Sequence, residues 1–470
     1  MQTNGPLLLS LILLFSTFNG FASVFAIPDT VRLELMHRHS PHAIGRVLFE
    51  QRPSTLERIK DLLRSDGVRR SMISNRLTSG GRRNVWATGA SAQLPLRSGA
   101  DYRTGQYFVT MKVGTPAQKF LLIADTGSDL TWINCDYRCG LDCARKRRSR
   151  RRRRFFRADI STSFRTVPCM SKMCKVELAN LFSLARCPTP LIPCAFDYRY
   201  LDGSAASGIF ANETVTLGLA NGKKRRLHNV LVGCSQSVRG PSFSVADGVM
   251  GLGFSDHSFA TKAARSFGGK FSYCLVDHLS SKNVSSFLTF GRAATKTPRS
   301  CMQFTQLALG VLSPFYAVHV AGISLDGVLL RIPVEVWDAN GAGGTILDSG
   351  SSLTSLAQPA FQPIMAALKL SLRAFQKLEL DVGPLEYCFN STGFVDSMVP
   401  KLRFHFVDGA RFEPPVKSYV IDVADGVKCL GFMSTSWPGF SVIGNIMQQN
   451  HLWEFDLGRG RLGFAPSACT

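Results

Sequence analysis

Two short segments of this 470-residue chain each carry an aspartate in a setting that favours chemistry. Residues 120–130 read FLLIADTGSDL and residues 344–353 read GTILDSGSSL, so Asp125 and Asp348 each follow an apolar run. Average composition would produce one D-[TS]-G-S motif in roughly one chain of this length in a hundred. The glycine permits a tight turn, and the hydroxyl can hydrogen-bond the carboxylate. Each motif is therefore expected to position its aspartate for a single shared site.

Paired carboxylates can hydrolyse a bond without help from any other group. Two carboxylates about 3 Å apart cannot both ionise, so the pair shares one proton. The ionised member accepts a proton from a water that attacks the scissile carbonyl. The protonated member donates to the carbonyl oxygen and then to the leaving nitrogen. The shared proton belongs to the pair, and neither aspartate is assigned as its holder. This chemistry needs no metal, no cofactor and no covalent intermediate.

The segments around the two motifs repeat each other, which predicts the elements that hold them. Residues 107–114 (YFVTMKVG) and 316–323 (YAVHVAGI) alternate apolar and polar side chains as half-buried strands do. Downstream of each aspartate an apolar pair ends in glycine, at 249–251 (VMG) and at 442–444 (VIG). The chain therefore predicts two related β lobes, each supplying one aspartate. A coincidental pair of turns in a β protein is the alternative.

These motifs resemble those of the pepsin-like aspartic proteases over about residues 101–470. Trp132 and Tyr200 match the active-site tryptophan and the flap tyrosine of that family. A cysteine-rich insert before the flap, the run IGNIMQQN at 443–450 and a closing GFAPSAC are similar to the plant nepenthesin-like branch. The resemblance implies an all-β, bilobal fold in which two related β-barrel lobes enclose an active-site cleft.

The same resemblance implies an aspartic endopeptidase that acts on proteins or peptides, is made as a zymogen and works as a monomer. Asp125 and Asp348 would form the catalytic dyad, with Ser128 and Ser351 hydrogen-bonded to their outer oxygens. Tyr200 would lie on a mobile hairpin and direct its hydroxyl towards Trp132. The motif residues that would support the dyad or the flap are Thr126, Gly127, Ser349, Gly350, Asp202 and Gly203. A catalytically silent inhibitor or binding protein of the same fold is the alternative, and both intact aspartates argue against it.

Composition divides the chain into four expected parts. Residues 1–26 resemble a secretory signal peptide, although their amino-terminal end lacks a basic residue and a signal anchor is the alternative. Residues 27–98 form a basic prosegment with thirteen Lys and Arg against six Asp and Glu. Such a segment can cover an acidic cleft, and acid would weaken that grip. The first lobe is expected over 99–290, with the insert (135–194) and the flap, and the second lobe over 291–470.

Cysteines and sequons favour an oxidising compartment. Because the cysteine spacing fits zinc poorly, disulfides are the preferred interpretation. The count of thirteen is odd, and Cys301 lacks a counterpart in the family pattern. We expect the secretory pathway, either outside the cell or in the vacuole, with the chloroplast as the alternative because one member of the branch is associated with it. The candidates are Cys135, Cys139, Cys143, Cys169, Cys174, Cys187, Cys194, Cys234, Cys274, Cys388, Cys429 and Cys469 for disulfides, and Asn212, Asn283 and Asn390 for glycosylation.

Residues 145–157, RKRRSRRRRRFFR, supply ten basic residues to a chain whose formal net charge is +22. Like charges in such a block repel one another, so a solvated flexible loop, open to nicking, is the preferred interpretation. Binding of DNA or another polyanion is the alternative, and it is compatible with proteolysis. No recognised nucleic-acid module accompanies the run.

Overall fold

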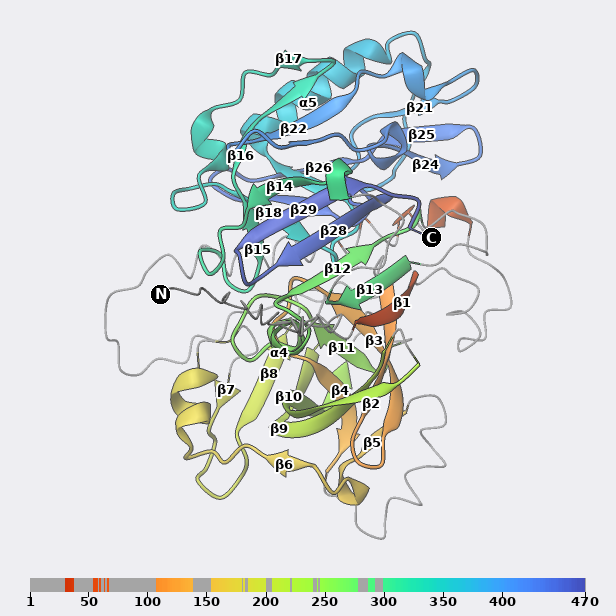
Figure 1. Cartoon of the computed structure of the whole chain (residues 1–470). Helices are drawn as coiled ribbons and strands as arrows, with labels where there is room; N and C mark the ends of the chain where they lie inside the picture. Colours follow the sequence, from red (N-terminus) through yellow and green to blue (C-terminus); the bar gives the residue numbers. More distant parts are fainter. Residues whose placement is uncertain are drawn as a thin grey trace, which may run out of the picture.

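The computed structural model is dominated by β-strands that form two lobes around a central sheet (Figure 1). The residues it describes are 30–37, 54–57, 59–60, 63, 66, 107–137, 154–179, 181, 185–199, 205–219, 222–239, 243, 246–277, 286–291 and 299–469. The expected signal peptide, most of the arginine run and several candidate residues lie outside these ranges, namely Tyr200, Asp202, Gly203, Cys139, Cys143 and Asn283.

Among its described residues, the first lobe combines long antiparallel strands with three parallel strand pairs. In the large sheet the order runs β2-β3-β11-β4-β10-β9-β8-β7, and β5 and β6 pair with β4 and β9 at its margin. These strands are β2 (Tyr107–Val113), β3 (Gln118–Asp125), β4 (Trp132–Asp136), β5 (Phe156–Arg157), β6 (Arg165–Thr166), β7 (Ala185–Arg186), β8 (Ala195–Arg199), β9 (Ala205–Gly218), β10 (Lys224–Arg239) and β11 (Gly248–Gly251).

The central part of the same sheet joins the two lobes. Here the order is β14-β29-β28-β12-β13-β1-β2, so strands from the end of the chain lie beside strands that follow the first lobe. These strands are β1 (Val31–His37), β12 (Lys270–Cys274), β13 (Ser286–Phe290), β14 (Gln303–Gln306), β28 (His451–Asp456) and β29 (Arg461–Pro466). The strand β1, from the expected prosegment, pairs with β13 on one side and with β2 on the other.

The second lobe contains three smaller sheets. The first has the order β15-β18-β27-β19-β26, the second β17-β16-β22-β23 and the third β20-β21-β25-β24. Their strands are β15 (Tyr316–Val318), β16 (Val320–Leu325), β17 (Val328–Leu329), β18 (Thr345–Asp348), β19 (Thr354–Ala357), β20 (Lys377–Leu378), β21 (Cys388–Asn390), β22 (Leu402–Phe406), β23 (Arg411–Phe412), β24 (Val420–Ala424), β25 (Val427–Leu430), β26 (Phe432–Thr435) and β27 (Ser441–Gly444).

Two α-helices of the described lobes pack against these sheets. Helix α4 (Phe259–Ser266) begins after Ser258, whose side chain accepts a hydrogen bond from the Thr261 amide at 3.2 Å and so caps the first turn. Helix α5 (Gln358–Ser371) buries Phe361, Ile364 and Leu368 at the three- and four-residue spacing of a helix face. Among the described residues, no helix is long and apolar enough to cross a membrane.

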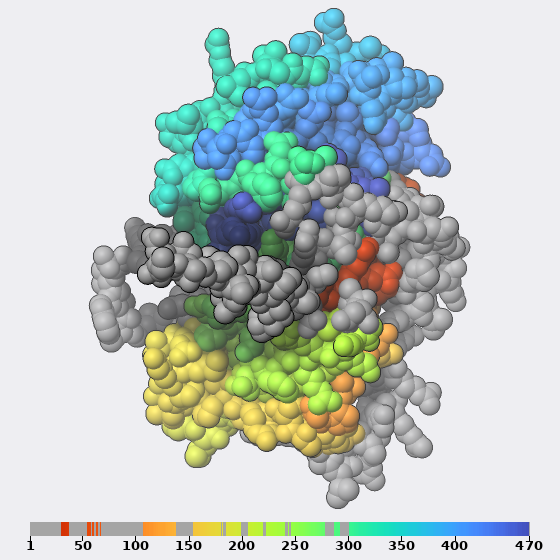
Figure 2. Space-filling model, viewed as in Figure 1, coloured from red at the N-terminus to blue at the C-terminus, as the bar shows by residue number. Residues whose placement is uncertain are grey.

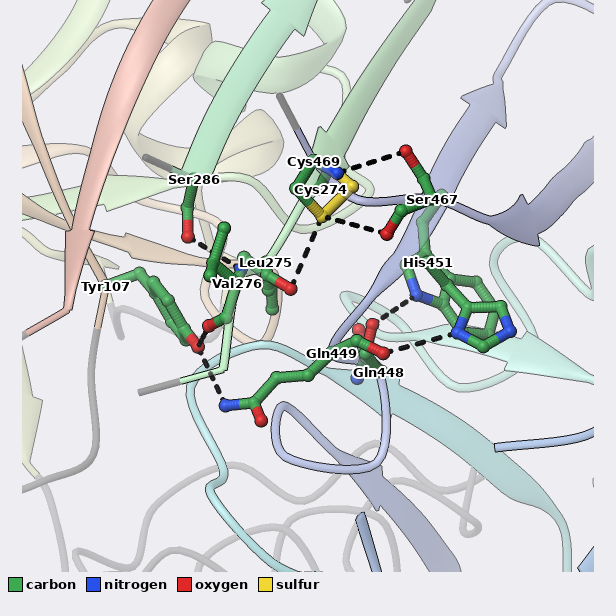
Figure 3. The surroundings of a disulfide bond; sticks show 11 residues. Tyr107, Cys274, Leu275, Val276, Ser286, Gln448, Gln449, His451, Ser467 and Cys469 are labelled. Carbon is green, nitrogen blue, oxygen red and sulfur yellow. Dashed lines mark hydrogen bonds between the residues drawn. A yellow bond between two sulfur atoms is a disulfide. The ribbon is translucent and has the colours of Figure 1, made fainter. Parts of the chain in front are cut away.

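A buried polar cluster ties the first lobe to the end of the chain (Figure 3). The hydroxyl of Tyr107, at the start of β2, donates to the carbonyl of Val276 at 2.9 Å and accepts from the side chain of Gln449 at 3.0 Å. Beside it, the disulfide between Cys274 and Cys469 closes the C-terminal segment onto β12. These contacts hold together segments that are far apart in the sequence.

Four further disulfides join described cysteines. They are Cys135–Cys234, Cys169–Cys187, Cys174–Cys194 and Cys388–Cys429. The first links the end of β4 to β10, the next two lie in the insert, and the last bridges β21 and β25. Cys301, the residue that the sequence leaves unmatched, is exposed and forms no disulfide with any described cysteine. Of the described sequons, Asn212 lies half-buried on β9, and Asn390 lies half-buried at the end of β21.

Candidate active site

Each candidate aspartate is the last residue of a buried strand. Strand β3 is buried from Phe120 to Asp125, and all four residues of β18, which ends at Asp348, are buried. Each of these strands has a parallel neighbour in matching register, since Asp125 lies opposite Gly251 of β11 and Asp348 opposite Gly444 of β27. The apolar-apolar-glycine segments of the sequence are therefore the strands that flank the two aspartates.

The two glycines are required because the backbone after each aspartate passes directly over them. A β-carbon on Gly251 would lie 2.7 Å from the carbonyl carbon of Leu130, and one on Gly444 would lie 2.3 Å from the carbonyl oxygen of Leu353. No side chain fits such an approach to the backbone. The flanking strand can thus lie close beneath the aspartate loop only where it has glycine.

The two carboxylates have matching hydrogen-bond partners. For Asp125, Oδ1 accepts from the Gly127 amide at 2.9 Å and Oδ2 accepts from the Ser128 hydroxyl at 2.8 Å. For Asp348, the corresponding donors are the Gly350 amide at 3.0 Å and the Ser351 hydroxyl at 2.7 Å. Both aspartates are buried, with exposed fractions of 3% and 0%. Two donors on each carboxylate fix its plane and orientation.

The residues that follow the aspartates join the two loops across the lobes. The Thr126 amide donates to the Ser349 hydroxyl at 3.1 Å, and the Ser349 amide donates to the Thr126 hydroxyl at 2.9 Å. The Ser349 hydroxyl donates in turn to the carbonyl of Ala124 at 3.2 Å. This exchange brings the loops together at the positions adjacent to Asp125 and Asp348. The sequence predicts that Thr126 and Ser349 support the dyad, and the structure adds the hydrogen bonds by which they join the two lobes.

Asn445 belongs to the site although sequence reasoning did not single it out. Its side-chain amide donates to the carbonyl of Ser349 at 3.0 Å, and its backbone amide donates to the carbonyl of Ser351 at 2.7 Å. The residue is fully buried directly after β27. An amide side chain immediately following the apolar-apolar-glycine segment is the signal that could have identified it. These two hydrogen bonds from Asn445 hold the loop that follows Asp348 in place.

Trp132 begins β4, and its side chain is fully buried. Its ring packs edge-on against Phe243, with 4.8 Å between the ring centroids. Within the described part of the chain, its indole nitrogen has no hydrogen-bond partner. The three other candidate flap residues belong to the part of the chain that the structure does not describe. A buried indole donor costs free energy unless an acceptor reaches it, so a partner from the flap is consistent with this environment.

Comparison with protein families matches most of both lobes. A family model described as "Xylanase inhibitor N-terminal" matches residues 107–292, and one described as "Xylanase inhibitor C-terminal" matches residues 315–466. Together the two matches include both aspartate motifs and the strands that flank them.

Curated plant proteins are similar along nearly the whole chain. "Aspartyl protease family protein 2" of Arabidopsis thaliana is 32% identical, over 87% of this chain and 84% of the relative. "Aspartic proteinase nepenthesin-1" of Nepenthes gracilis is 29% identical, over 95% of this chain and 96% of the relative. The pepsin-like, nepenthesin-like resemblance of the sequence is thereby confirmed.

Solved structures of plant proteins share the fold. The crystal structure of basic 7S globulin from soybean has a TM-score of 0.61 at 20% identity, over 78% of this chain and 94% of the other. The structure described as "edgp" has a TM-score of 0.62 at 20% identity, over 78% and 93%. These likenesses confirm the predicted all-β, bilobal fold, and at such identity they show the fold alone.

Proposed function

Because this chain belongs to the nepenthesin-like branch of the pepsin-like aspartic proteases of plants, we propose that it is an aspartic endopeptidase made as a zymogen. The observation that carries the proposal is the matched setting of Asp125 and Asp348. Each carboxylate accepts one backbone amide and one serine hydroxyl, and the adjacent residues Thr126 and Ser349 are hydrogen-bonded to each other. Paired, oriented carboxylates on two joined loops are the arrangement that peptide hydrolysis by a shared proton requires.

The mechanism assigns one role to the pair and another to the residues around it. The dyad activates a water as general base, and it protonates the carbonyl oxygen and the leaving nitrogen as general acid. Ser128 and Ser351, with the glycine amides, keep both carboxylates oriented before substrate arrives, so little reorganisation is needed during the reaction. The role of the cross-lobe hydrogen bonds is to keep the two carboxylates at a constant separation.

Extended peptides are the proposed substrates, held under a flap that carries Tyr200. The buried indole of Trp132 supports this proposal, because its nitrogen has no acceptor among the described residues and a tyrosine hydroxyl would supply one. In this arrangement Tyr200 strengthens substrate binding and orientation, while the dyad carries out bond cleavage. Loss of Tyr200 is therefore expected to weaken turnover, and loss of either aspartate to abolish it.

The proposed setting is the secretory pathway, outside the cell or in the vacuole, with the chloroplast as the alternative. The five disulfides among described cysteines support an oxidising compartment. The protein would act as a monomer on proteins or peptides after removal of its own prosegment. Fusion of residues 1–26 to a fluorescent protein in plant cells tests the destination directly.

A silent binding protein of the same fold is the second candidate function. The descriptions of the two matching family models support this candidate, since both name xylanase inhibitors. Against it stand the two intact aspartates, each of which accepts an amide and a serine hydroxyl. An inhibitor needs a surface for its target enzyme and does not need two oriented carboxylates.

Polyanion binding through residues 145–157 is proposed only as an accompanying property. Arg157, at the end of the run, is already paired with Asp159 through two hydrogen bonds of 2.7 and 2.5 Å. The remaining cations of the run would have to supply the affinity. Salt-dependent retention on heparin or DNA, lost on deletion of residues 145–154, is the expected result. Equal retention by the deleted chain would exclude this role for the run.

Proteolysis by the whole chain decides between the first two functions. We would express it with its prosegment and follow casein and haemoglobin cleavage from acid to neutral pH, with and without pepstatin. Asp125→Asn should abolish pepstatin-sensitive cleavage, and Asp256→Asn is the matched control because Asp256 is exposed and paired only with Arg265 among the described residues. Cleavage by the Asp125→Asn chain at the original rate would refute the mechanism. Absence of cleavage by every folded chain would favour the silent protein.

A further inference from the structure

A helical part of the expected prosegment lies against the second lobe. Residues 55–57, 59–60, 63 and 66 are helical. The segment begins with a capping box, in which the Glu57 amide donates to the Ser54 hydroxyl at 3.2 Å and the Ser54 amide donates to the Glu57 carboxylate at 2.7 Å. Figure 1 shows this segment, in orange-red, beside β24 of the second lobe.

One face of the segment is buried. Ile59 and Leu63 are only 1% and 2% exposed, and they belong to a cluster that includes Leu353 and Ile446, which flank the second aspartate loop in space. Leu56 packs against the same cluster. The spacing of positions 56, 59, 63 and 66 is that of neighbours on one helix face. The apolar side chains and Asp66 therefore contact the second lobe from the same face of the helix.

Asp66 ends this face with a contact next to the candidate active site. Its carboxylate accepts the Ser352 amide at 2.7 Å and also accepts the Leu353 amide. These amides follow the Asp348-Ser-Gly-Ser351 motif directly in the chain. The side chain of Asp66 is 1% exposed. A carboxylate buried from solvent and held by two consecutive backbone amides is a built anchor rather than a surface contact.

The prosegment has a second attachment at the opposite end of its described part. Strand β1 lies between β13 and β2 in the central sheet, pairing Val31 with Phe290 and Leu35 with Val109. Figure 2 shows β1, in red, at the level between the yellow-green first lobe and the blue second lobe. The segment is thus held both at the sheet that joins the lobes and at the loop of Asp348.

We propose that Asp66 is a latch by which the prosegment holds the Asp348 loop and keeps the full-length chain inactive. The proposal of inactivity rests on the endopeptidase function proposed above, whereas the contact between Asp66 and the two amides does not. Once the prosegment is removed, the Ser352 and Leu353 amides lose the carboxylate that occupies them. The loop is then released from the segment that holds it.

The pH dependence of this contact is opposite to that expected for a basic prosegment held on an acidic cleft by charge alone, which acid would weaken. Burial, with a smaller contribution from the charge of Asp348, raises the pKa of Asp66 to about 7, although the hydrogen bonds from Ser352 and Leu353 act to lower it. On the segment itself, Glu57 is exposed and Lys60 is half-buried. Because the docked pKa exceeds the ordinary value of 3.8, docking takes up a proton. The latch is therefore tighter in acid and looser as the pH rises through 7.

Hydrogen exchange at the Ser352 and Leu353 amides tests the latch without any need for proteolysis. We would use the full chain carrying Asp125→Asn, so that it cannot process itself, and compare Asp66→Asn and Asp66→Ala with the control Glu57→Gln. Glutamine at position 57 can still form the capping box. Asparagine at position 66 replaces one carboxylate oxygen with an NH₂ group, which donates and cannot accept a hydrogen bond from a backbone amide. We expect exchange at these two amides to be faster by about tenfold or more in both Asp66 variants, as loss of two hydrogen bonds predicts. Glu57→Gln should leave it unchanged.

Equal protection in the Asp66 variants and in their parent would overturn the latch, provided that their thermal unfolding shows a folded chain. If Asp66→Ala does not fold, the milder Asp66→Asn chain decides. In the parent, protection corrected for intrinsic exchange should be greater at pH 5 than at pH 8, and this difference should vanish in Asp66→Asn. A parent without the difference would contradict the pH response.

With Asp125 restored, Asp66→Asn should shorten the lag before casein cleavage, and an unchanged lag would contradict autoinhibition. If even the processed chain cleaves nothing, the endopeptidase proposal fails while the exchange result still stands.

Discussion

Thr126 and Ser349 each donate a backbone amide to the hydroxyl of the other, although 223 residues separate them. Each directly follows one of the two candidate catalytic aspartates. The exchange joins the lobes at the point where both carboxylates are presented. The separation of the two carboxylates therefore depends on a contact between lobes, and the accuracy of the site depends on how the lobes pack.

Removing one hydroxyl from this exchange should loosen the site. Thr126→Val keeps the shape of the side chain but leaves the buried Ser349 amide without its acceptor, which should cost about 1–3 kcal/mol of unfolding free energy. Denaturant unfolding measures this cost, and casein cleavage should fall with it. Thr162→Val is the matched control, because Thr162 is exposed. A Thr126→Val chain as stable and active as the parent would contradict the role of the exchange.

Filling the space under the second aspartate loop should be more damaging than filling open space. A β-carbon on Gly444 would meet backbone oxygens of Leu353 and Ser352 at 2.3 and 2.7 Å. Gly444→Ala should therefore lower the unfolding free energy by about 1–3 kcal/mol and displace Asp348, which reduces turnover. Gly218→Ala, with no atom within 4 Å of its added carbon, should change stability by less than about 1 kcal/mol. Similar thermal shifts in both variants would show that the close approach is not the cause.

The disulfide at the C-terminus should contribute strongly to stability because it closes a long stretch of chain. Cys274 and Cys469 are 195 residues apart in sequence. Replacing both with serine should cost about 2–5 kcal/mol, measured by denaturant unfolding under non-reducing conditions. Cys301→Ser should change stability by no more than about 0.5 kcal/mol, because the side chain is exposed and free. A smaller loss for the paired cysteines than for Cys301 would be incompatible with this assignment.

Buried His451 should make the fold less stable in acid. Burial lowers the pKa of His451 below its usual 6.5, and the hydrogen bond with the Gln449 carbonyl only partly offsets this. The unfolded chain therefore binds a proton below pH 6.5 that the folded chain resists, so stability is lost as the pH falls from 6.5 towards the lowered value. His451→Asn should flatten the decline of unfolding free energy between pH 7 and pH 5. An unchanged slope in that window would assign the decline to other groups.

Much of the site could be predicted from local sequence because its parts are local. Asp125, Gly127 and Ser128 form their hydrogen bonds within four residues, and the same is true around Asp348. Strand alternation and the paired apolar-apolar-glycine segments likewise predict two β lobes, since each strand buries one face or both. These features follow from turn chemistry and from side-chain periodicity, and both can be seen in a short stretch of residues.

Only the tertiary structure shows the contacts between residues that are far apart in the sequence. The pairing of Thr126 with Ser349, the bracing by Asn445 and the contact of Asp66 with the Ser352 amide join positions up to 286 residues apart. Nothing in a threonine, an asparagine or a helical aspartate indicates which distant backbone group it will reach. By itself the sequence determined the two aspartate loops and the strands that carry them. Only the packing of the lobes and of the segment that carries Asp66 decided how the loops are joined and what contacts the second one, because such contacts are set by the folded arrangement and not by local pattern.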